Sequence, residues 1–397
     1  MVAKIAKEFN NRLIVVMGGP HSSLVGRKIF GFPGVDISVR GEGEDTIIEL
    51  LNAVAAGRDL YGIRGTLFRK NGEIIENPAR EFIGDLDTLC FPHESAPEVL
   101  KDYDRYPPDA FKNIFTTRGC PFNCFYCGSR YIWGRHVRFR SIANIIKEIK
   151  GLQEKGITTI HFDDDIFGVN RNYIKELSSA LLKHCPGIRW SCELHIKLVD
   201  DEIISMMKSA GCYLIQVGIE SGSNEMLRLI HKDITIEEAF RACRIIKKHK
   251  IELHAFFIVG FPQETDQTLK ATMRAIKRID CDMISYSIFT PYPGTESFDF
   301  CKERGMIDDS YDVSYYNHQS PKNYFCINMP QERFRIYAST IEKMVDRKNL
   351  IRNWINRIRE NFSIESLRGI KKLGIKGTLT TGARKIKTMT RIISRLR

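Results

Sequence analysis

The chain has 397 residues, 43% hydrophobic and 27% charged, which is ordinary for a globular protein and long enough for more than one domain. No apolar run approaches the roughly 18 residues of a membrane span, and the apolar stretch at 13–17 is too short for a secretory signal. These features argue against a membrane-spanning or secreted protein, and we expect a cytoplasmic one. The formal net charge is +12.

The first 80 residues predict a partial α/β domain. Its strand, turn and helix segments are, in chain order, RLIVVM (12–17), GGPH (18–21), VDISV (35–39), RGEGE (40–44) and TIIELLNAV (46–54). These segments amount to about half of a doubly wound, Rossmann-like domain. A hairpin around Asn71-Gly72 follows, which we read as a linker to the next domain.

From residue 113 to about 304 a single unit repeats six times: a β-branched strand, a loop and a helical stretch. The expected strands are NIFTT (113–117), ITTIHF (157–162), IRWSCE (188–193), YLIQVGI (213–219), IELHAFFIV (251–259) and MISYSIF (283–289). Strands alternating with helices predict right-handed βαβ units and a parallel sheet. Six units fall short of the eight of a full barrel. We therefore predict an open (β/α)6 partial TIM barrel, within a core at 81–308.

A loop with three cysteines, RGCPFNCFYCGSR, follows the first barrel strand. Cys120, Cys124 and Cys127 are close enough in sequence to converge on one metal centre. A structural zinc ion normally takes four protein ligands, and no fourth Cys or His lies at a matching spacing. Thiolates are the usual ligands of iron–sulfur clusters. We predict a [4Fe-4S] cluster with one iron left open, at the carboxyl ends of the strands where such barrels carry their chemistry.

After the barrel we expect an extension at 309–346 and a helical tail at 347–397. The tail holds fifteen Lys or Arg residues and two Glu, a net charge of +13, so the rest of the chain is close to neutral. Apolar residues repeat at helical spacing in NLIRNWINRIRENF and again in ARKIKTMTRIISRLR. A basic amphipathic helix suits an anionic membrane surface. The alternatives are a helix packed on the barrel and a solvated terminus.

With its cysteine loop ahead of a six-unit barrel, the sequence resembles the radical S-adenosylmethionine enzymes. The resemblance implies that the open iron is chelated by the amino and carboxylate groups of S-adenosylmethionine. It also implies that an external one-electron reductant drives cleavage of this cofactor to a 5′-deoxyadenosyl radical. The likeness extends over nearly all of residues 12–305.

The resemblance also suggests cofactor contacts strand by strand. Asp163 and Asp164, after the second strand, match a motif near the amino group of the cofactor, although a solvated helix-capping loop is the alternative. Glu220 and Ser221, in GIESGS, look like ribose or amino-acid contacts. Two further positions match parts of the family that meet the adenine: Tyr126, and Gly260 in VGFPQET, which a plain turn would explain equally well.

The amino-terminal segment resembles the second half of a cobalamin-binding domain. The resemblance places Gly18, Gly19, Gly41 and Gly43 in turns where the backbone approaches the nucleotide tail of cobalamin. The first strands of that domain have no counterpart ahead of residue 12. We expect a truncated reading frame or a descendant that has lost the cofactor, and cobalamin binding that is weak or absent.

The implied function is modification of an unactivated carbon, with methyl transfer to a small molecule or lipid as the leading reaction. A cobalamin-free radical cyclase, or a methylthiolating enzyme acting on RNA or protein, is the alternative enzyme. A non-enzymatic electron-transfer or sensor protein is a further alternative. The tail suggests peripheral association with the inner membrane face, and its sparse aromatic residues argue against nucleic acid as a partner. No catalytic side chain is assigned.

Overall fold

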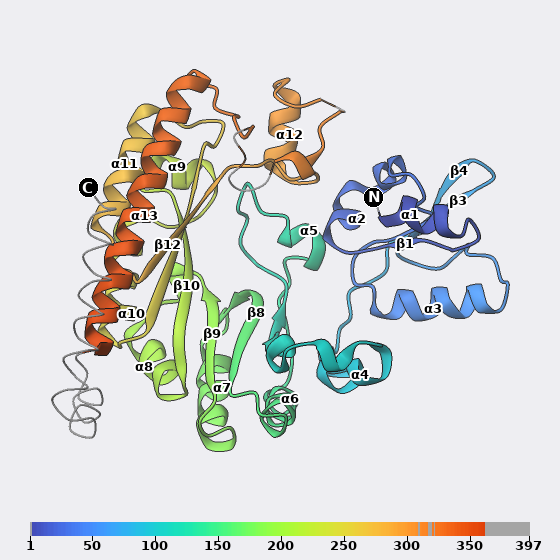
Figure 1. Ribbon diagram of the computed structural model, residues 1–397, viewed down its shortest axis with the longest axis horizontal. Helices are drawn as coiled ribbons and strands as arrows, with labels where there is room; N and C mark the ends of the chain where they lie inside the picture. The colour runs from blue at the N-terminus through green and yellow to red at the C-terminus, as the bar shows by residue number, and fades with distance from the viewer. Residues whose placement is uncertain (1, 309, 317–319, 321, 362–397) are drawn as a thin grey trace, which may run out of the picture. The chain divides into compact units, whose positions relative to one another are not determined.

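The computed structural model describes residues 2–308, 310–316, 320 and 322–361. The chain divides into two compact units, Met1–Met344 and Val345–Arg397. The first unit contains two sheets, a four-stranded one near the amino terminus and a six-stranded one in the barrel. Figure 1 colours them from blue, through green, to yellow.

The amino-terminal sheet has the strand order β1-β2-β3-β4. Its elements are α1 (Val2–Phe9), β1 (Val16–Met17), α2 (Pro20–Val25), β2 (Ile37–Val39), α3 (Glu44–Ala55), β3 (Thr66–Lys70) and β4 (Glu73–Glu76). β1 and β2 are parallel, as the partial doubly wound domain requires, whereas β3 and β4 are antiparallel additions. The β3–β4 hairpin pairs with β2, so it is part of the domain, and the prediction of a linker was wrong.

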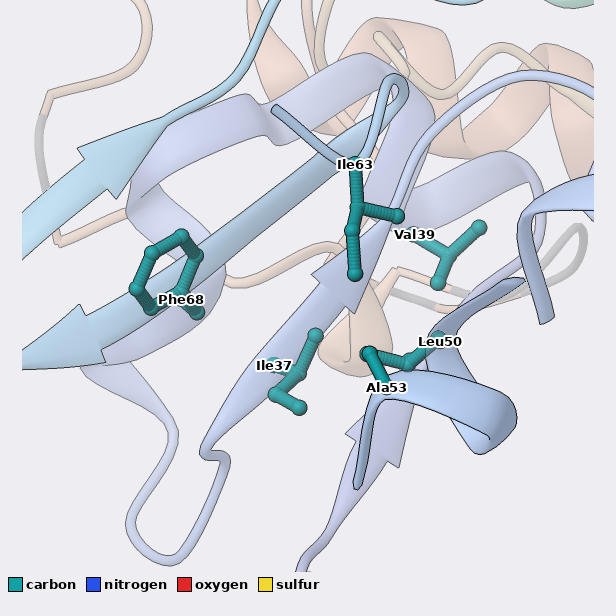
Figure 2. Packing of buried hydrophobic residues seen from close by; sticks show 6 residues of the cluster. All are labelled: Ile37, Val39, Leu50, Ala53, Ile63 and Phe68. Atoms are coloured by element: carbon teal, nitrogen blue, oxygen red, sulfur yellow. The ribbon is translucent and has the colours of Figure 1, made fainter. Parts of the chain in front are cut away.

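Apolar side chains explain why the hairpin joins this sheet. One core cluster lies between α3 and the sheet, and Figure 2 shows its members Ile37, Val39, Leu50, Ala53, Ile63 and Phe68. Leu67 belongs to a second cluster with Ile29, Phe30 and Val35. Because successive strand residues face opposite sides, β3 contributes to both cores. Asn71 and Gly72 turn the hairpin with φ values of 51° and 84°, the left-handed pattern of a tight two-residue turn.

The barrel sheet confirms the predicted topology. Its order is β12-β11-β10-β9-β8-β5, and every pair is parallel. The strands are β5 (Asn113–Ile114), β8 (Thr159–Phe167), β9 (Arg189–Leu194), β10 (Cys212–Glu220), β11 (Glu252–Val259) and β12 (Met283–Ile288). Six strands in sequential order form an open sheet curved into a partial barrel, so their carboxyl ends share one rim.

The helices α6 to α12 each begin where a polar side chain caps the first turn, whereas α4 and α5 have no side-chain cap. The helices of the first unit outside the amino-terminal sheet are α4 (Pro92–Val99), α5 (Ser129–Trp133), α6 (Ile142–Glu154), α7 (Arg171–His184), α8 (Asp201–Ser209), α9 (Asn224–Leu229), α10 (Ile236–Lys248), α11 (Asp266–Arg278) and α12 (Glu296–Glu303). Ser141, Asn170, Asp200 and Thr235 cap α6, α7, α8 and α10 by accepting a backbone N–H. These caps fix where each βα loop ends.

Two barrel strands differ from the prediction. The first one stops at Ile114, and residues 117–118 form β6 (Thr117–Arg118), which pairs antiparallel with β7 (Arg138–Phe139). The second one continues to Phe167, so its acidic run lies within a strand rather than in a loop. Its register shifts between Phe162 and Phe167. At 115–117, side chains from other elements bond the backbone in place of a strand ladder.

The last helix that the structure describes is α13 (Gln331–Asn361), which crosses the predicted boundary at 346/347 without interruption. Its first turns, in the first unit, bury Phe334 and Ile341. In the second unit the structure describes its continuation from Val345 to Asn361, where Leu350 and Ile351 are exposed. The rest of the predicted tail lies outside the described residues. Among the residues that are described, none belongs to a helix with the length and apolarity needed to span a membrane.

Candidate functional site

The cysteine loop is anchored by backbone hydrogen bonds at its start and in its middle. The N–H of Cys120 donates to the carbonyl of Gly134 at 3.2 Å, and the N–H of Phe125 donates to the carbonyl of Ile230 at 3.0 Å. The side chain of Phe125 is itself buried, which holds the middle of the loop in place. These anchors hold the loop over the rim formed by the carboxyl ends of the barrel strands.

The three predicted cysteines line one cavity of about 300 Å³. Cys120, Cys124 and Cys127 are free thiols of intermediate exposure. Tyr126 and Glu220, which the sequence also singled out, line the same cavity. Three converging thiols on the wall of a cavity with room for a ligand suit a cluster that keeps one iron open.

Among the described residues, no three His, Cys, Asp or Glu side chains are placed to hold a single metal ion. A multinuclear cluster binds each thiolate to a different iron, so its three sulfur ligands need not meet at one point. Burial raises the pKa of Cys120 to about 11 in the metal-free protein.

A buried ion pair also forms part of the cavity wall. The Nζ of Lys232 is 2.9 Å from Oε1 of Glu220, and both residues are buried. Glu220 adopts a φ of +66° at a register shift that ends β10. A non-glycine residue held in this conformation is characteristic of functional sites. A Cβ on Gly218 would lie 2.2 Å from the Glu220 carboxylate, so glycine makes room for the pair.

The cavity wall is predominantly acidic. Asp165 and Glu193 line it together with Glu220, whereas Lys232 is the cation among the lining residues of this cavity. Partial burial raises the pKa of Glu193, and the negative charges of Asp163, Asp165 and Glu220 add to the effect. Such a wall favours a cationic ligand. S-adenosylmethionine carries a sulfonium and an ammonium group.

His195 and Phe122 close one side of this cavity. Their rings stack with centroids 3.8 Å apart, and both line the cavity. Burial lowers the pKa of His195 to about 3, so the imidazole is neutral. Its Nδ1 accepts from the N–H of Lys197, which leaves the proton on Nε2. Phe122 also lines an adjacent groove of about 620 Å³, and the two rings therefore separate the two spaces.

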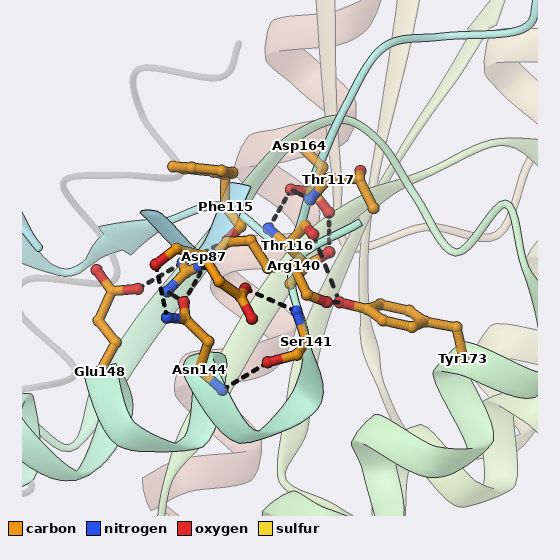
Figure 3. Close-up of polar contacts among 10 residues, drawn as sticks. All are labelled: Asp87, Phe115, Thr116, Thr117, Arg140, Ser141, Asn144, Glu148, Asp164 and Tyr173. Atoms are coloured by element: carbon orange, nitrogen blue, oxygen red, sulfur yellow. Dashed lines mark hydrogen bonds and ion pairs between the residues drawn. The ribbon is translucent and has the colours of Figure 1, made fainter. Parts of the chain in front are cut away.

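The acidic run of β8 is placed differently from the prediction. Asp163 and Asp164 do not line the cavity, and Asp165 does. The Asp164 carboxylate is buried and turned toward the stem of the cysteine loop. It accepts the N–H of Thr116 at 2.6 Å, the N–H of Thr117 at 3.0 Å and the hydroxyl of Thr116 (Figure 3). The period of two along a strand places Asp164 on the face opposite that of Asp163 and Asp165.

Arg140 completes the support beneath the stem. Its Nη1 donates to the carbonyl of Phe115 at 2.8 Å and to the buried carboxylate of Glu148 at 2.6 Å (Figure 3). The hydroxyl of Tyr173 donates to the carbonyl of Arg140 at 2.8 Å. Backbone groups at 115–117 are thus bonded by side chains, which explains why the first barrel strand is short.

Two other predicted contacts lie outside the cavity wall. Ser221 is buried, and its hydroxyl is 3.2 Å from that of Thr272 on α11. Gly260, with a φ of +89°, ends β11, and its N–H donates to buried Glu264 at 3.0 Å. A Cβ there would lie 2.6 Å from the ring of Phe334. Their assignment as cofactor contacts stays a prediction.

The glycine turns of the amino-terminal sheet follow β1 and β2. Gly19 and Gly41 have φ values of 90° and 70°, and no atom lies within 4 Å of a Cβ built on either. The N–H of Gly41 donates to the hydroxyl of Ser23 at 2.9 Å, which joins the two turns. Gly18 and Gly43 are in ordinary contact with Val39. Open backbone at the carboxyl ends of parallel strands is compatible with a nucleotide-like ligand.

The sheet order and the thiol-lined cavity together define a cluster-binding partial (β/α) barrel. Residues 114–276 match the model of the Radical SAM superfamily. Over 310 residues the chain is 36% identical to an uncharacterized methyltransferase of Pyrococcus horikoshii, covering 77% of this chain and 67% of the relative. The chain belongs to the radical S-adenosylmethionine superfamily, whose members use a [4Fe-4S] cluster and S-adenosylmethionine.

Further relatives include enzymes of more than one reaction type. The chain is 29% identical over 329 residues to the anaerobic magnesium-protoporphyrin IX monomethyl ester cyclase of Rubrivivax gelatinosus, covering 80% of this chain and 58% of the cyclase. The fold of the present chain is similar to that of TsrM, a radical S-adenosylmethionine methyltransferase from Kitasatospora setae solved with cobalamin and a [4Fe-4S] cluster. The TM-score is 0.64 with 21% identity, over 76% of this chain and 60% of TsrM.

A second solved structure extends the likeness over more of the chain. The cobalamin-dependent enzyme OxsB matches 86% of this chain and 50% of its own, with a TM-score of 0.60 and 20% identity. This similarity shows a shared fold, with the α/β domain ahead of the barrel. The chain spans between about half and two thirds of the length of the relatives it matches.

Proposed function

We propose that this chain binds a [4Fe-4S] cluster through Cys120, Cys124 and Cys127 and cleaves S-adenosylmethionine reductively to modify an unactivated carbon. The observation that carries the proposal is the common cavity of these thiols, Tyr126 and the Glu220–Lys232 pair. The cluster supplies an electron to the sulfonium when both groups are bound and an external one-electron donor has reduced it. The chain itself supplies position, charge and exclusion of water.

The acidic wall gives the cofactor its orientation. We assign the cationic groups of S-adenosylmethionine to the side formed by Asp165, Glu193 and Glu220, because charge-assisted hydrogen bonds are strongest in a partly dry site. Lys232 keeps Glu220 in place and offsets part of the negative charge. Tyr126 stays a proposed adenine contact. Ser221 and Gly260 stay proposed cofactor contacts, whereas Asp164 supports the cavity through the backbone at 116–117.

The cluster assignment can be tested on anaerobically purified protein. We expect four irons per chain, an electron paramagnetic resonance (EPR) signal of a reduced [4Fe-4S] cluster, and formation of 5′-deoxyadenosine with a chemical reductant. Cys124→Ala should abolish the signal and the cleavage, whereas Cys301→Ala, which removes a buried thiol far along the sequence, should preserve both. One zinc and no iron in the wild type, or cleavage by the Cys124→Ala variant, would falsify the assignment.

Methyl transfer to a small molecule or lipid is the reaction we propose. The name of the methyltransferase from Pyrococcus horikoshii supports it, and the cyclase supports ring closure as the alternative. The two reactions differ in the fate of the cofactor methyl group. S-adenosylmethionine labelled with deuterium in its methyl group should give a product three mass units heavier than an unlabelled control. An unlabelled product that has lost hydrogen would favour cyclisation.

The glycine turns at Gly18, Gly19, Gly41 and Gly43 are the surface we assign to cobalamin. The assignment rests on the open backbone at Gly19 and Gly41 and on the fold shared with cobalamin-dependent enzymes. Gly43→Phe is the suitable test variant, because Gly43 has an ordinary φ and a Cβ there meets only Val39. We expect any binding of hydroxocobalamin by the wild type to be weak, and the variant to weaken it further in a titration. Equal affinity would remove these turns from the site.

A further inference from the structure

The stem of the cysteine loop places two arginines directly opposite each other. β6 and β7 form a two-stranded ladder in which Arg118 pairs with Arg138. The side chains are 12% and 8% exposed. Like charges at directly opposed positions repel each other, and burial increases the cost. The ladder therefore needs negative charge from another part of the chain.

That charge comes from the amino-terminal domain. Glu42, whose side chain is 1% exposed, lies 2.8 Å from Nη1 of Arg118 and 2.8 Å from Nη1 of Arg138. Glu44 takes the second nitrogen of Arg118 at 2.6 Å. Two carboxylates thus balance two guanidinium groups. The N–H of Ile83 adds a bond to Glu42 at 2.6 Å, so both oxygens of its carboxylate are engaged.

Aromatic rings also hold the two guanidinium groups in position. The Arg118 guanidinium lies over Phe115 and Trp133, at 4.8 and 4.9 Å from the ring centroids. Arg138 lies over Phe82 at 4.8 Å. A guanidinium stacked on a ring and bonded through separate nitrogens has little rotational freedom. The position of the Glu42 and Glu44 carboxylates is therefore transmitted to the backbone of β6.

Cys120 follows this stem after a single residue. Gly119 has a φ of +109°, and a Cβ on it would lie 2.4 Å from the carbonyl oxygen of His136 in the segment leading to β7. The chain between the ladder and Cys120 is therefore a single, closely packed glycine with little freedom to move. A displacement of Arg118 consequently moves Cys120.

We propose that Glu42 and Glu44 are positioning residues for the cysteine loop, and that the amino-terminal domain is in this way a structural part of the cluster site. The inference rests on the proposed cluster ligation. The proposal gives the segment RGEGE (40–44) two roles. Its glycines form the turn, and its two glutamates hold Arg118 and Arg138. The domain is thus required for correct cluster geometry whether or not cobalamin binds.

The test compares Glu44→Gln and Glu42→Gln with a matched control. Glu49→Gln removes a carboxylate from the same helix, α3, whose ion-pair partner is Arg80. Glu44 is 38% exposed, so its variant is expected to fold. We expect Glu44→Gln to keep its iron, to show an altered EPR spectrum of the reduced cluster, and to form 5′-deoxyadenosine about ten- to a hundredfold more slowly. Glu49→Gln should match the wild type in all three measurements.

A charge-balance rescue addresses Glu42, whose loss leaves a buried arginine without its counter-charge. Glu42→Gln should lose iron on desalting, and adding Arg138→Gln should restore iron content and the EPR spectrum, because one Arg118–Glu44 pair then remains. The proposal fails if Glu44→Gln matches Glu49→Gln, or if the second substitution does not improve Glu42→Gln. A wild type without any cluster would instead refute the proposed function, and the two failures are therefore distinguishable.

Discussion

Glu264 shows how one buried side chain makes the stability of the barrel rim dependent on pH. It is 1% exposed and accepts the N–H of Gly260 and the hydroxyl of Thr268, both at 3.0 Å. Burial raises the pKa of this carboxyl to about 7, and the two hydrogen bonds only partly oppose the shift. Between pH 4.5 and 7 the folded chain therefore holds a proton that the unfolded chain has released.

The free energy of unfolding should accordingly fall as the pH rises from 4.5 to about 7. Above this range the ionisation of Glu264 should change it little further. Glu264→Gln removes the titration and keeps an acceptor for Gly260. The variant should be more stable than the wild type at pH 8, by on the order of 1 to 3 kcal/mol, and nearly equal to it at pH 4.5. Thermal denaturation of the metal-free protein at both pH values measures the difference. A difference that is the same at both would contradict the prediction.

Residues that act through distant partners were the hardest to predict from the sequence. The cysteine spacing predicted the three thiols that line the cavity, because thiolates are the usual ligands of iron–sulfur clusters. By contrast, the short segment HKD (231–233) contains no motif that indicates a role for Lys232. This residue reaches Glu220 because His231 and Asp233 on either side adopt positive φ values. The two glutamates of RGEGE were hidden by the glycines between them, since the sequence gives no sign of Arg118 as their partner.

The acidic strand β8 determines the position of the loop stem at the scale of secondary structure. Its Asp164 bonds the backbone of the stem, 48 and 47 residues away in sequence. Asp164→Ala leaves two buried N–H groups unpaired, at about 1 to 3 kcal/mol each. Asp164→Asn keeps an acceptor of the same shape. We expect the Ala variant to unfold several degrees lower and to retain less iron, while the Asn variant stays close to the wild type.

Melting temperatures and iron content of the two variants test this role. If Asn were as damaging as Ala, the carboxylate charge rather than the backbone bonding would be what matters at this position.

Periodicity predicted the other elements of the barrel with small errors. β10 was expected at 213–219 and spans Cys212–Glu220, and β11 was expected at 251–259 and spans Glu252–Val259. These strands alternate apolar residues at a period that only a strand explains. β8 broke the pattern because three consecutive aspartates look like a loop. They are tolerated in a strand because Asp164 is fully bonded and Asp165 faces a cavity.

At the scale of the whole chain, positive charge is concentrated in the carboxyl-terminal segment, which holds fifteen Lys or Arg residues after 346. We propose that it binds an anionic membrane surface, where each Lys or Arg contributes on the order of 1 kcal/mol. α13 continues to Asn361, so a chain ending there leaves the helix intact and removes ten of the fifteen basic residues after 346. Full-length protein should sediment with anionic vesicles and not with neutral ones.

The shortened chain should lose this binding, and added salt should weaken the binding of the full-length chain because exposed charges are screened. Equal sedimentation of both chains with anionic vesicles would show that residues 362–397 have no such role.

The sequential strand order also has a consequence for how the protein acquires its iron. β5, at one edge of the barrel sheet, pairs with β8 only through Asn113 and Ile114, whereas β10 and β11 each pair on both sides along most of their length. Local opening should therefore begin at the β5 edge. Within the barrel sheet of the apoprotein, amide hydrogen exchange should be fastest in β5 and slowest in β10 and β11. Insertion of a cluster would then require opening of one edge of the sheet only, while the rest of the barrel stays folded.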